Sequence, residues 1–114
     1  MNPDKLLILW TTDDKETAEN MILMYTLKSN LNNWWKECHL VTWGPSNKLL
    51  VTDPEIQVMV NQIQETGVKL FACRRCAESY GIVDKLEALN AEVILMGEPL
   101  TQCLQDPSWR ILTI

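Results

Sequence analysis

The sequence predicts an α/β fold: a three-layer α/β/α sandwich around a five-stranded, mostly parallel sheet. Short apolar runs bounded by polar residues recur along the chain, as in strands buried on both faces. Segments with helical periodicity separate these runs, and this alternation favours right-handed βαβ crossovers. The 114 residues suffice for one domain with a core but not for two, so we expect a single domain over residues 1–114.

The first predicted strand and helix occupy the start of the chain. Residues 6–10 (LLILW) form a continuous apolar run between polar neighbours. Asp13 followed three residues later by Glu16 is typical of a helix N-cap with its capping partner. Apolar residues then recur at helical spacing at Ala18, Met21, Ile22 and Tyr25. We therefore expect a helix that buries this stripe and ends near residues 30–33.

The second strand and helix have clear boundaries. Residues 38–43 (CHLVTW) predict the strand, which Gly44-Pro45 stops. The next helix is expected to begin after Asp53, because a capping residue precedes a proline at the first helical position. Its apolar stripe consists of Ile56, Met59, Val60 and Ile63. Gly67 is expected to end this helix.

The rest of the chain continues the alternation of strand and helix. Further strands are predicted at residues 68–72, 91–96 and 109–114. Residues 74–89 have helical character with an interruption near Gly81, and residues 99–105 predict a short helix. The order of the strands within the sheet does not follow from these patterns.

The composition excludes several classes of protein. The net charge is −5 and no basic block exceeds the Arg74-Arg75 pair, which argues against nucleic-acid or anionic-membrane binding. No apolar run approaches the roughly 20 residues that a spanning helix needs. The N-terminal MNPDKLLILW segment lacks the features of a signal peptide, so we expect a cytoplasmic protein. The four cysteines are then expected to be free thiols.

The carboxyl ends of the strands are the expected place for a site, because open α/β sheets bind ligands there. The residues delivered to that edge include Trp10, Thr11, Thr12, Trp43, Cys73, Arg74, Gly97 and Glu98. We expect the two tryptophans and the cysteine to line a shallow apolar pocket, with the Arg74 guanidinium at its rim. For each tryptophan taken alone, packing in a core or an interface is the alternative.

Cys73 is the strongest candidate for chemistry, since it ends a strand and starts a helix. The positive end of a helix dipole favours a thiolate, and Arg74 and Arg75 add positive charge beside it. Cys76 lies one helical turn further on, where it would form a disulfide with Cys73 or resolve a persulfide on it. In the alternative, Cys73 is a small buried hydrophobe that closes the strand, because free cysteine is among the most buried residue types.

Other chemistries have less support. A C-x-x-C motif near βαβ units is typical of thioredoxin-like proteins, but here it follows the third strand and no proline that would face it is evident. Cys38, His39 and Cys103 are the other soft metal ligands, and the first two fall at the opposite edge of the sheet, so we expect no metal site. No glycine-rich phosphate-binding motif follows a strand, so we expect no nucleotide cofactor.

The opening strand and its polar turn are followed by Gly67-Val68-x-Leu70-x-x-Cys73 and, eight residues after the cysteine, by Gly81-Ile82-Val83-Asp84. On these features the chain resembles the DsrE-like sulfur-relay family, whose fold is flavodoxin- or Rossmann-like. The resemblance implies a parallel five-stranded sandwich in which Cys73 accepts sulfur as a persulfide from a donor protein and passes it to an acceptor protein. It also implies assembly as a trimer or hexamer. Cys76 lies outside the family pattern.

Three functions remain open. In the first, the chain is a sulfur carrier: Cys73 holds the sulfur, Arg74 stabilises its charge, and Trp10 and Trp43 shield it from water. In the second, it is a redox protein that cycles a disulfide between Cys73 and Cys76. In the third, it is a non-catalytic oligomeric or ligand-binding module. We rank the three in that order, and the chain is a sulfurtransferase-like protein only in the first.

Overall fold

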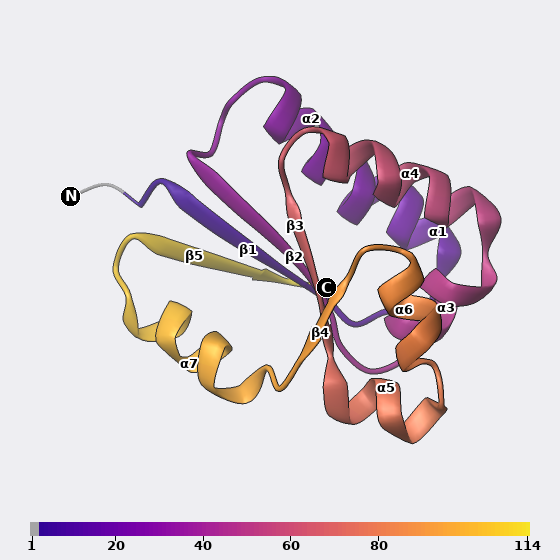
Figure 1. Ribbon diagram of the computed structural model, residues 1–114. Coiled ribbons are helices and arrows are strands. Elements are labelled where there is room, and N and C mark those ends of the chain that lie inside the picture. Colours follow the sequence, from indigo (N-terminus) through magenta and orange to yellow (C-terminus); the bar gives the residue numbers. More distant parts are fainter. Residues whose placement is uncertain (1–2) are drawn as a thin grey trace.

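A computed structural model describes residues 3–114 and contains one parallel sheet with helices on both sides (Figure 1). The strands are β1 (Lys5–Trp10), β2 (Glu37–Thr42), β3 (Lys69–Cys73), β4 (Glu92–Ile94) and β5 (Trp109–Thr113). The helices are α1 (Lys15–Thr17), the π-helical η1 (Ala18–Leu23), α2 (Met24–Leu31), α3 (Ser46–Thr52), α4 (Pro54–Glu65), α5 (Arg74–Tyr80), α6 (Val83–Ala88) and α7 (Gly97–Gln105). The predicted fold class is confirmed.

The order of the strands in the sheet is β4-β3-β2-β1-β5, and all neighbouring strands are parallel. The chain steps outward from β1 to β4 and then crosses back to place β5 on the other side of β1. Because parallel crossovers are right-handed, steps in one direction put their helices on one face and the return step uses the other face. Figure 1 accordingly shows α7 apart from the other helices, across the sheet.

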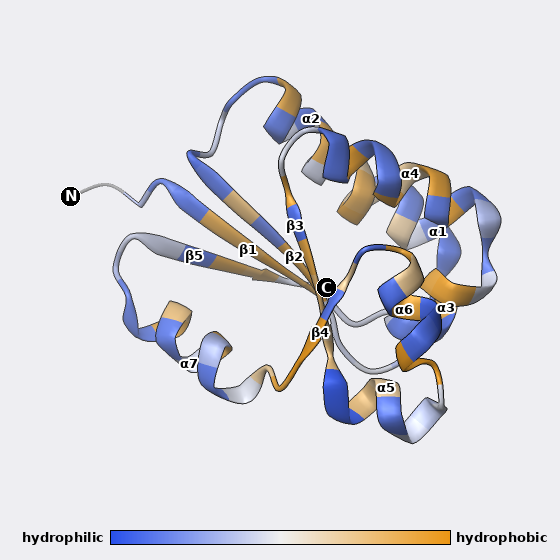
Figure 2. Cartoon of the chain, viewed as in Figure 1, coloured by the Kyte–Doolittle hydropathy of each residue, from blue (hydrophilic) through white to orange (hydrophobic). Residues whose placement is uncertain are grey.

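The two faces of the sheet are unequally covered. On one face the strands and helices share a large core that includes Ile8, Trp10, Leu40 and Leu86. On the other face, here called the second face, the buried cluster is smaller and consists of Leu7, Val41, Cys73 and Met96 among residues 3–114. The hydrophobic colour continues from β4 into the connection to α7, which borders this second face (Figure 2). Helices thus lie on both faces, as expected, but one nine-residue helix provides most of the second layer.

The first helical segment differs from its prediction in two ways. Its N-cap is Asp14 rather than Asp13: the Asp14 carboxylate accepts hydrogen bonds from the Thr17 N–H and hydroxyl at 2.9 and 2.6 Å. The helix then widens into η1, and the additional residue in the π turn rotates the following side chains. As a result Met21 is exposed and Leu23 is buried.

The periodicity also failed to predict α3, whose seven residues are too few for an apolar stripe to stand out. The predicted boundaries of the next elements are close to those observed. Asp53 caps α4 by accepting from the N–H groups of Glu55 and Ile56. Gly81, at a φ of 68°, separates α5 from α6, since this left-handed conformation suits glycine.

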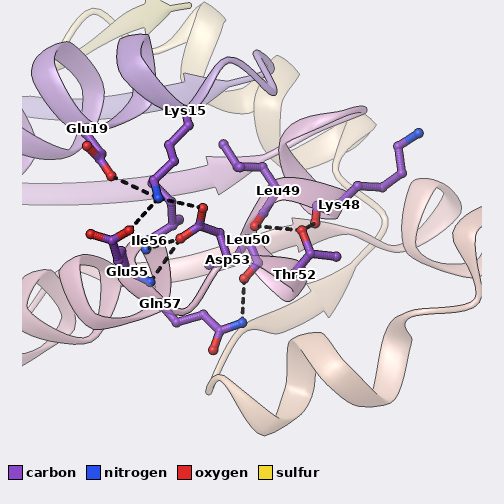
Figure 3. A network of polar contacts seen from close by, with 10 residues as sticks. All are labelled: Lys15, Glu19, Lys48, Leu49, Leu50, Thr52, Asp53, Glu55, Ile56 and Gln57. Carbon is purple, nitrogen blue, oxygen red and sulfur yellow. Dashed lines mark hydrogen bonds and ion pairs between the residues drawn. The ribbon is translucent and has the colours of Figure 1, made fainter.

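Lys15 joins the start of the first helical segment to the start of α4 (Figure 3). Its Nζ lies 2.7 Å from Glu55 Oε1 and 3.0 Å from Asp53 Oδ2, and Glu19 is 3.7 Å away. The hydrogen bonds to Glu55 and Asp53 raise the pKa of Lys15, and the Lys15 ammonium lowers the pKa of Asp53. One cation therefore links the carboxylate that caps α4 to a different helix.

We predict that Lys15→Met lowers the midpoint of thermal unfolding by no more than a few degrees, because the ion pairs are exposed to solvent. The loss should shrink in high salt, which screens exposed charges. Thermal scans followed by circular dichroism at low and high ionic strength measure both effects. Lys28→Met, at an exposed lysine of α2, is the control. A loss that is the same at both salt concentrations would contradict the electrostatic explanation.

Candidate functional site

Cys73 stands where the sequence predicts it, at the carboxyl end of β3 and directly before α5. It pairs in register with Ile94 of β4, and its side chain packs in the second-face core. Only 5% of Cys73 is exposed. In its burial, Cys73 matches the alternative expectation of a buried side chain that closes the strand, because residues of the second face enclose the strand end.

Cys76 lies in the first turn of α5 and is partly exposed. Its side chain packs against the same second-face core, and the Gly44 N–H donates a hydrogen bond to its Sγ at 3.4 Å. Burial raises the pKa of the Cys76 thiol, the Gly44 hydrogen bond offsets part of that rise, and the neighbouring Cys73 adds to it. The two cysteines are free thiols, so the site contains one buried and one partly exposed cysteine.

The loop that carries Gly44 is held by buried polar side chains. Asn47 donates through Nδ2 to the Gly44 carbonyl at 3.0 Å, and its Oδ1 accepts from the Thr42 hydroxyl at 2.7 Å. The Ser46 hydroxyl donates to the Trp10 carbonyl at 2.5 Å and accepts from the Trp43 N–H at 3.1 Å. Thr42, Ser46 and Asn47 are fully buried.

Sequence reasoning did not identify these three residues as part of the site. The sequence feature that could have identified them is the small polar side chains on either side of the Gly44-Pro45 turn, because such side chains often form hydrogen bonds to nearby backbone groups. The network fixes the direction of the Gly44 N–H toward Cys76.

Arg74 is directed toward β4. Its Nε donates to the Val93 carbonyl at 3.2 Å, and its Nη1 lies 3.9 Å from a carboxylate oxygen of Glu78. The guanidinium therefore joins the start of α5 to the edge of the sheet. These contacts are with Val93 and Glu78 and not with Cys73, so they do not place Arg74 at the predicted rim of a pocket beside Cys73.

The predicted pocket at the carboxyl edge does not form as one site. Trp10 is fully buried in the large core and donates its Nε1–H to the Thr12 carbonyl at 2.9 Å, whereas Trp43 packs on the second face. The two rings lie on opposite faces of the sheet, so they do not line one pocket. The backbone N–H groups of Thr11 and Thr12 bond to the carbonyl of Ile114.

The remaining two predicted pocket residues, Gly97 and Glu98, are exposed in the first turn of α7. Of the predicted site residues, the structure therefore brings together Cys73, Cys76 and Trp43, whose side chains share the second-face core.

A cavity of about 310 Å³ lies between α7 and the second face. Its lining includes Met96, Ile94, Phe71, His39, Cys103 and Trp109, but not Cys73. The His39 ring packs between Phe71 and Trp109, with centroids at 5.1 and 4.9 Å. Its Nε2 lies 2.8 Å from a Glu37 carboxylate oxygen, but the two groups are not aligned to form a hydrogen bond. Burial lowers the pKa of His39 despite the opposing effect of Glu37.

Within residues 3–114, no three or more His, Cys, Asp or Glu side chains are grouped in a way that would hold a metal ion. None of the helices in that range is both long and apolar enough to cross a membrane.

The chain is thus a small α/β protein with a five-stranded parallel sheet and a cysteine at the end of β3. The chain belongs to the DsrE/DsrF-like family, whose model matches residues 4–114. Among solved structures it is similar to BT1422 from Bacteroides thetaiotaomicron, a conserved protein of unknown function, with 40% identity and a TM-score of 0.93. That match covers 97% of this chain and 95% of the other.

Two more distant structures share the fold. MTH1491 from Methanobacterium thermoautotrophicum, of unknown function, is 18% identical, with a TM-score of 0.73 over 96% of this chain and 98% of that one. The ychN protein from E. coli is 16% identical, with a TM-score of 0.70 over the whole of both chains. No curated protein matches this chain.

We predict that native Cys76 reacts with iodoacetamide well before Cys73, because Cys76 is the more exposed thiol. The Cys76 rate should keep increasing with pH above neutrality, since its raised pKa leaves little thiolate at pH 7. Trypsin separates the two sites, because Arg74 and Arg75 lie between them, so peptide mass spectrometry gives each rate. In urea both should react alike, and a native Cys73 as fast as Cys76 would show that Cys73 is accessible.

We predict that Asn47→Ala destabilises the protein by about 1–3 kcal/mol, because the buried Thr42 hydroxyl and Gly44 carbonyl lose their partner. Urea unfolding measures the change. The matched control is Asn61→Ala, at an exposed asparagine of α4. The same variant should make Cys76 less reactive toward iodoacetamide, because a loosened Gly44 N–H no longer stabilises its thiolate. An unchanged stability would exclude a structural role for the network.

Proposed function

We propose that the protein is a sulfur-relay protein that carries sulfur as a persulfide on Cys73. Membership of the DsrE/DsrF-like family supports a function related to sulfur relay. The observation that carries the proposal is the pair of free thiols at the carboxyl end of β3, where open α/β sheets place their reactive groups. One of the two cysteines is enclosed, which suits a stored sulfur, and the other is partly exposed.

The chemistry needs only thiols. A thiolate of the protein attacks the outer sulfur of a donor persulfide, so that a new sulfur–sulfur bond forms and the donor's sulfur–sulfur bond breaks. The donor leaves as a thiolate and takes up the proton that the protein thiol lost. An acceptor thiolate later attacks the same outer sulfur, and the protein thiolate leaves. The sulfur moves without a net change of oxidation state.

The surroundings of Cys73 suit storage. Leu7, Val41 and Met96 enclose it on the second face, so an outer sulfur there would be shielded from water and from stray thiols. Trp43 packs against the same core, whereas Trp10 belongs to the other face and has no part in the shielding. The proposal further includes a cytoplasmic location, protein donors and acceptors, and a homo-oligomer.

We predict that incubation with glutathione persulfide adds the mass of one sulfur atom to the tryptic peptide that contains Cys73. After the incubation and before digestion, the protein is alkylated to trap the persulfide. Cys73→Ser should remove this load, while Cys103→Ser, which changes a partly exposed thiol of α7, should leave it unchanged.

Two results would contradict the proposal. In the first, the folded native protein gains no sulfur. In the second, it forms a disulfide between Cys73 and Cys76 without any retained sulfur, which would favour the dithiol redox function instead.

A further inference from the structure

We propose that Cys76 is the thiol that receives sulfur from the donor, and that the sulfur then passes within the chain from Cys76 to Cys73. This inference rests on the proposed function and assigns the two thiols different roles: Cys76 takes sulfur up and Cys73 stores it. It gives a role to the cysteine that lies outside the family pattern.

Access is the first argument. To accept sulfur, the attacking thiol must reach the outer sulfur of a persulfide that is attached to a larger molecule. Cys73 is 5% exposed and packs in the second-face core, so a bulky donor has less access to it than to a thiol nearer the surface. Cys76 is partly exposed in the first turn of α5. It is therefore the sulfur atom of the pair that such a donor meets.

The second argument is the fixed hydrogen bond to Cys76. The Gly44 N–H points at its Sγ from the neighbouring loop at 3.4 Å. This N–H belongs to the Trp43–Gly44 peptide, whose carbonyl accepts from the Ser46 hydroxyl at 3.3 Å. Asn47 holds the next peptide through the Gly44 carbonyl. A backbone N–H favours the charged form of a sulfur atom, both as the attacking thiolate and as the persulfide anion that follows. Because buried side chains anchor the loop, the Gly44 N–H is already in place when the sulfur donor arrives.

The third argument is the position of the two cysteines at the start of α5. Cys73 ends β3 as the N-cap residue of α5, and Cys76 lies three residues further on in the first turn of that helix. The neighbouring Cys73 also raises the pKa of the Cys76 thiol. Both side chains contact the same second-face core. Two thiols that pack against one core at the start of one helix are placed for transfer within the chain.

The transfer is balanced. The Cys76 thiolate attacks the outer sulfur of the donor, and the donor leaves as a thiolate. The Cys73 thiolate then attacks the outer sulfur now on Cys76: the bond between Cys73 Sγ and that sulfur forms, and its bond to Cys76 Sγ breaks. Cys76 leaves as a thiolate and takes up the proton that Cys73 gave up. Attack on the inner sulfur would instead give a Cys73–Cys76 disulfide and release hydrosulfide.

The test follows the arrival of sulfur over time. The native protein is mixed with glutathione persulfide, trapped with iodoacetamide at intervals and digested with trypsin, which separates the two cysteines. We expect sulfur on Cys76 first and on Cys73 later. In Cys76→Ser, loading of Cys73 should be about tenfold slower, whereas Cys73→Ser should still load Cys76 at close to the native rate. Cys103→Ser is the control, and circular dichroism checks that each variant is folded.

The outcomes separate this inference from the proposed function. If Cys76→Ser loads Cys73 at the native rate, the relay is wrong but Cys73 is still a carrier. Hydrosulfide release with a disulfide also overturns the relay, since sulfur then leaves the chain. If no sulfur appears on either cysteine of the native protein, the proposed function fails and the relay with it. If Cys76→Ser is not folded, Cys76→Ala replaces it, and the order of arrival in the native protein decides by itself.

Discussion

The return crossover from β4 to β5 determines how the two faces of the sheet differ. The first three crossovers run in one direction, so they place α1 to α6 and a large core on one face. The last crossover runs the other way and leaves α7 as the main cover of the second face. Cys73 ends β3 on this thinly covered face, so a small cluster of side chains encloses it.

A small polar network fixes the local geometry beside that position. The side chains of Thr42, Ser46 and Asn47 are fully buried and have hydrogen-bond partners. Leaving a buried polar group without a partner costs free energy, so loop conformations that break these hydrogen bonds are disfavoured. That conformation directs the Gly44 N–H at Cys76, and it joins the ends of β1 and β2 to the first turn of α5. The network therefore connects the stability of the loop to the environment of a thiol.

The family and the site contribute different parts of the functional argument. The match to the DsrE/DsrF-like family indicates a function related to sulfur relay, whereas the neighbouring thiols indicate which atoms would do the chemistry. Their contrast in exposure is the feature that a carrier needs, because uptake requires contact with a donor and storage requires protection from solvent. In the proposed relay, Cys76 in the first turn of α5 would take up sulfur and Cys73 at the end of β3 would store it.

The sequence by itself determined the five strands, the cap at Asp53, the break at Gly81 and the place of Cys73 at the end of β3. These features depend on residues close together in the chain, so apolar runs, capping residues and glycines reveal them. Only the tertiary structure decided which face each residue lies on. It separated Trp10 from Trp43, enclosed Cys73 and turned Arg74 toward β4. Those outcomes depend on strand order and crossover direction, which involve contacts between distant segments and leave no local pattern in the sequence.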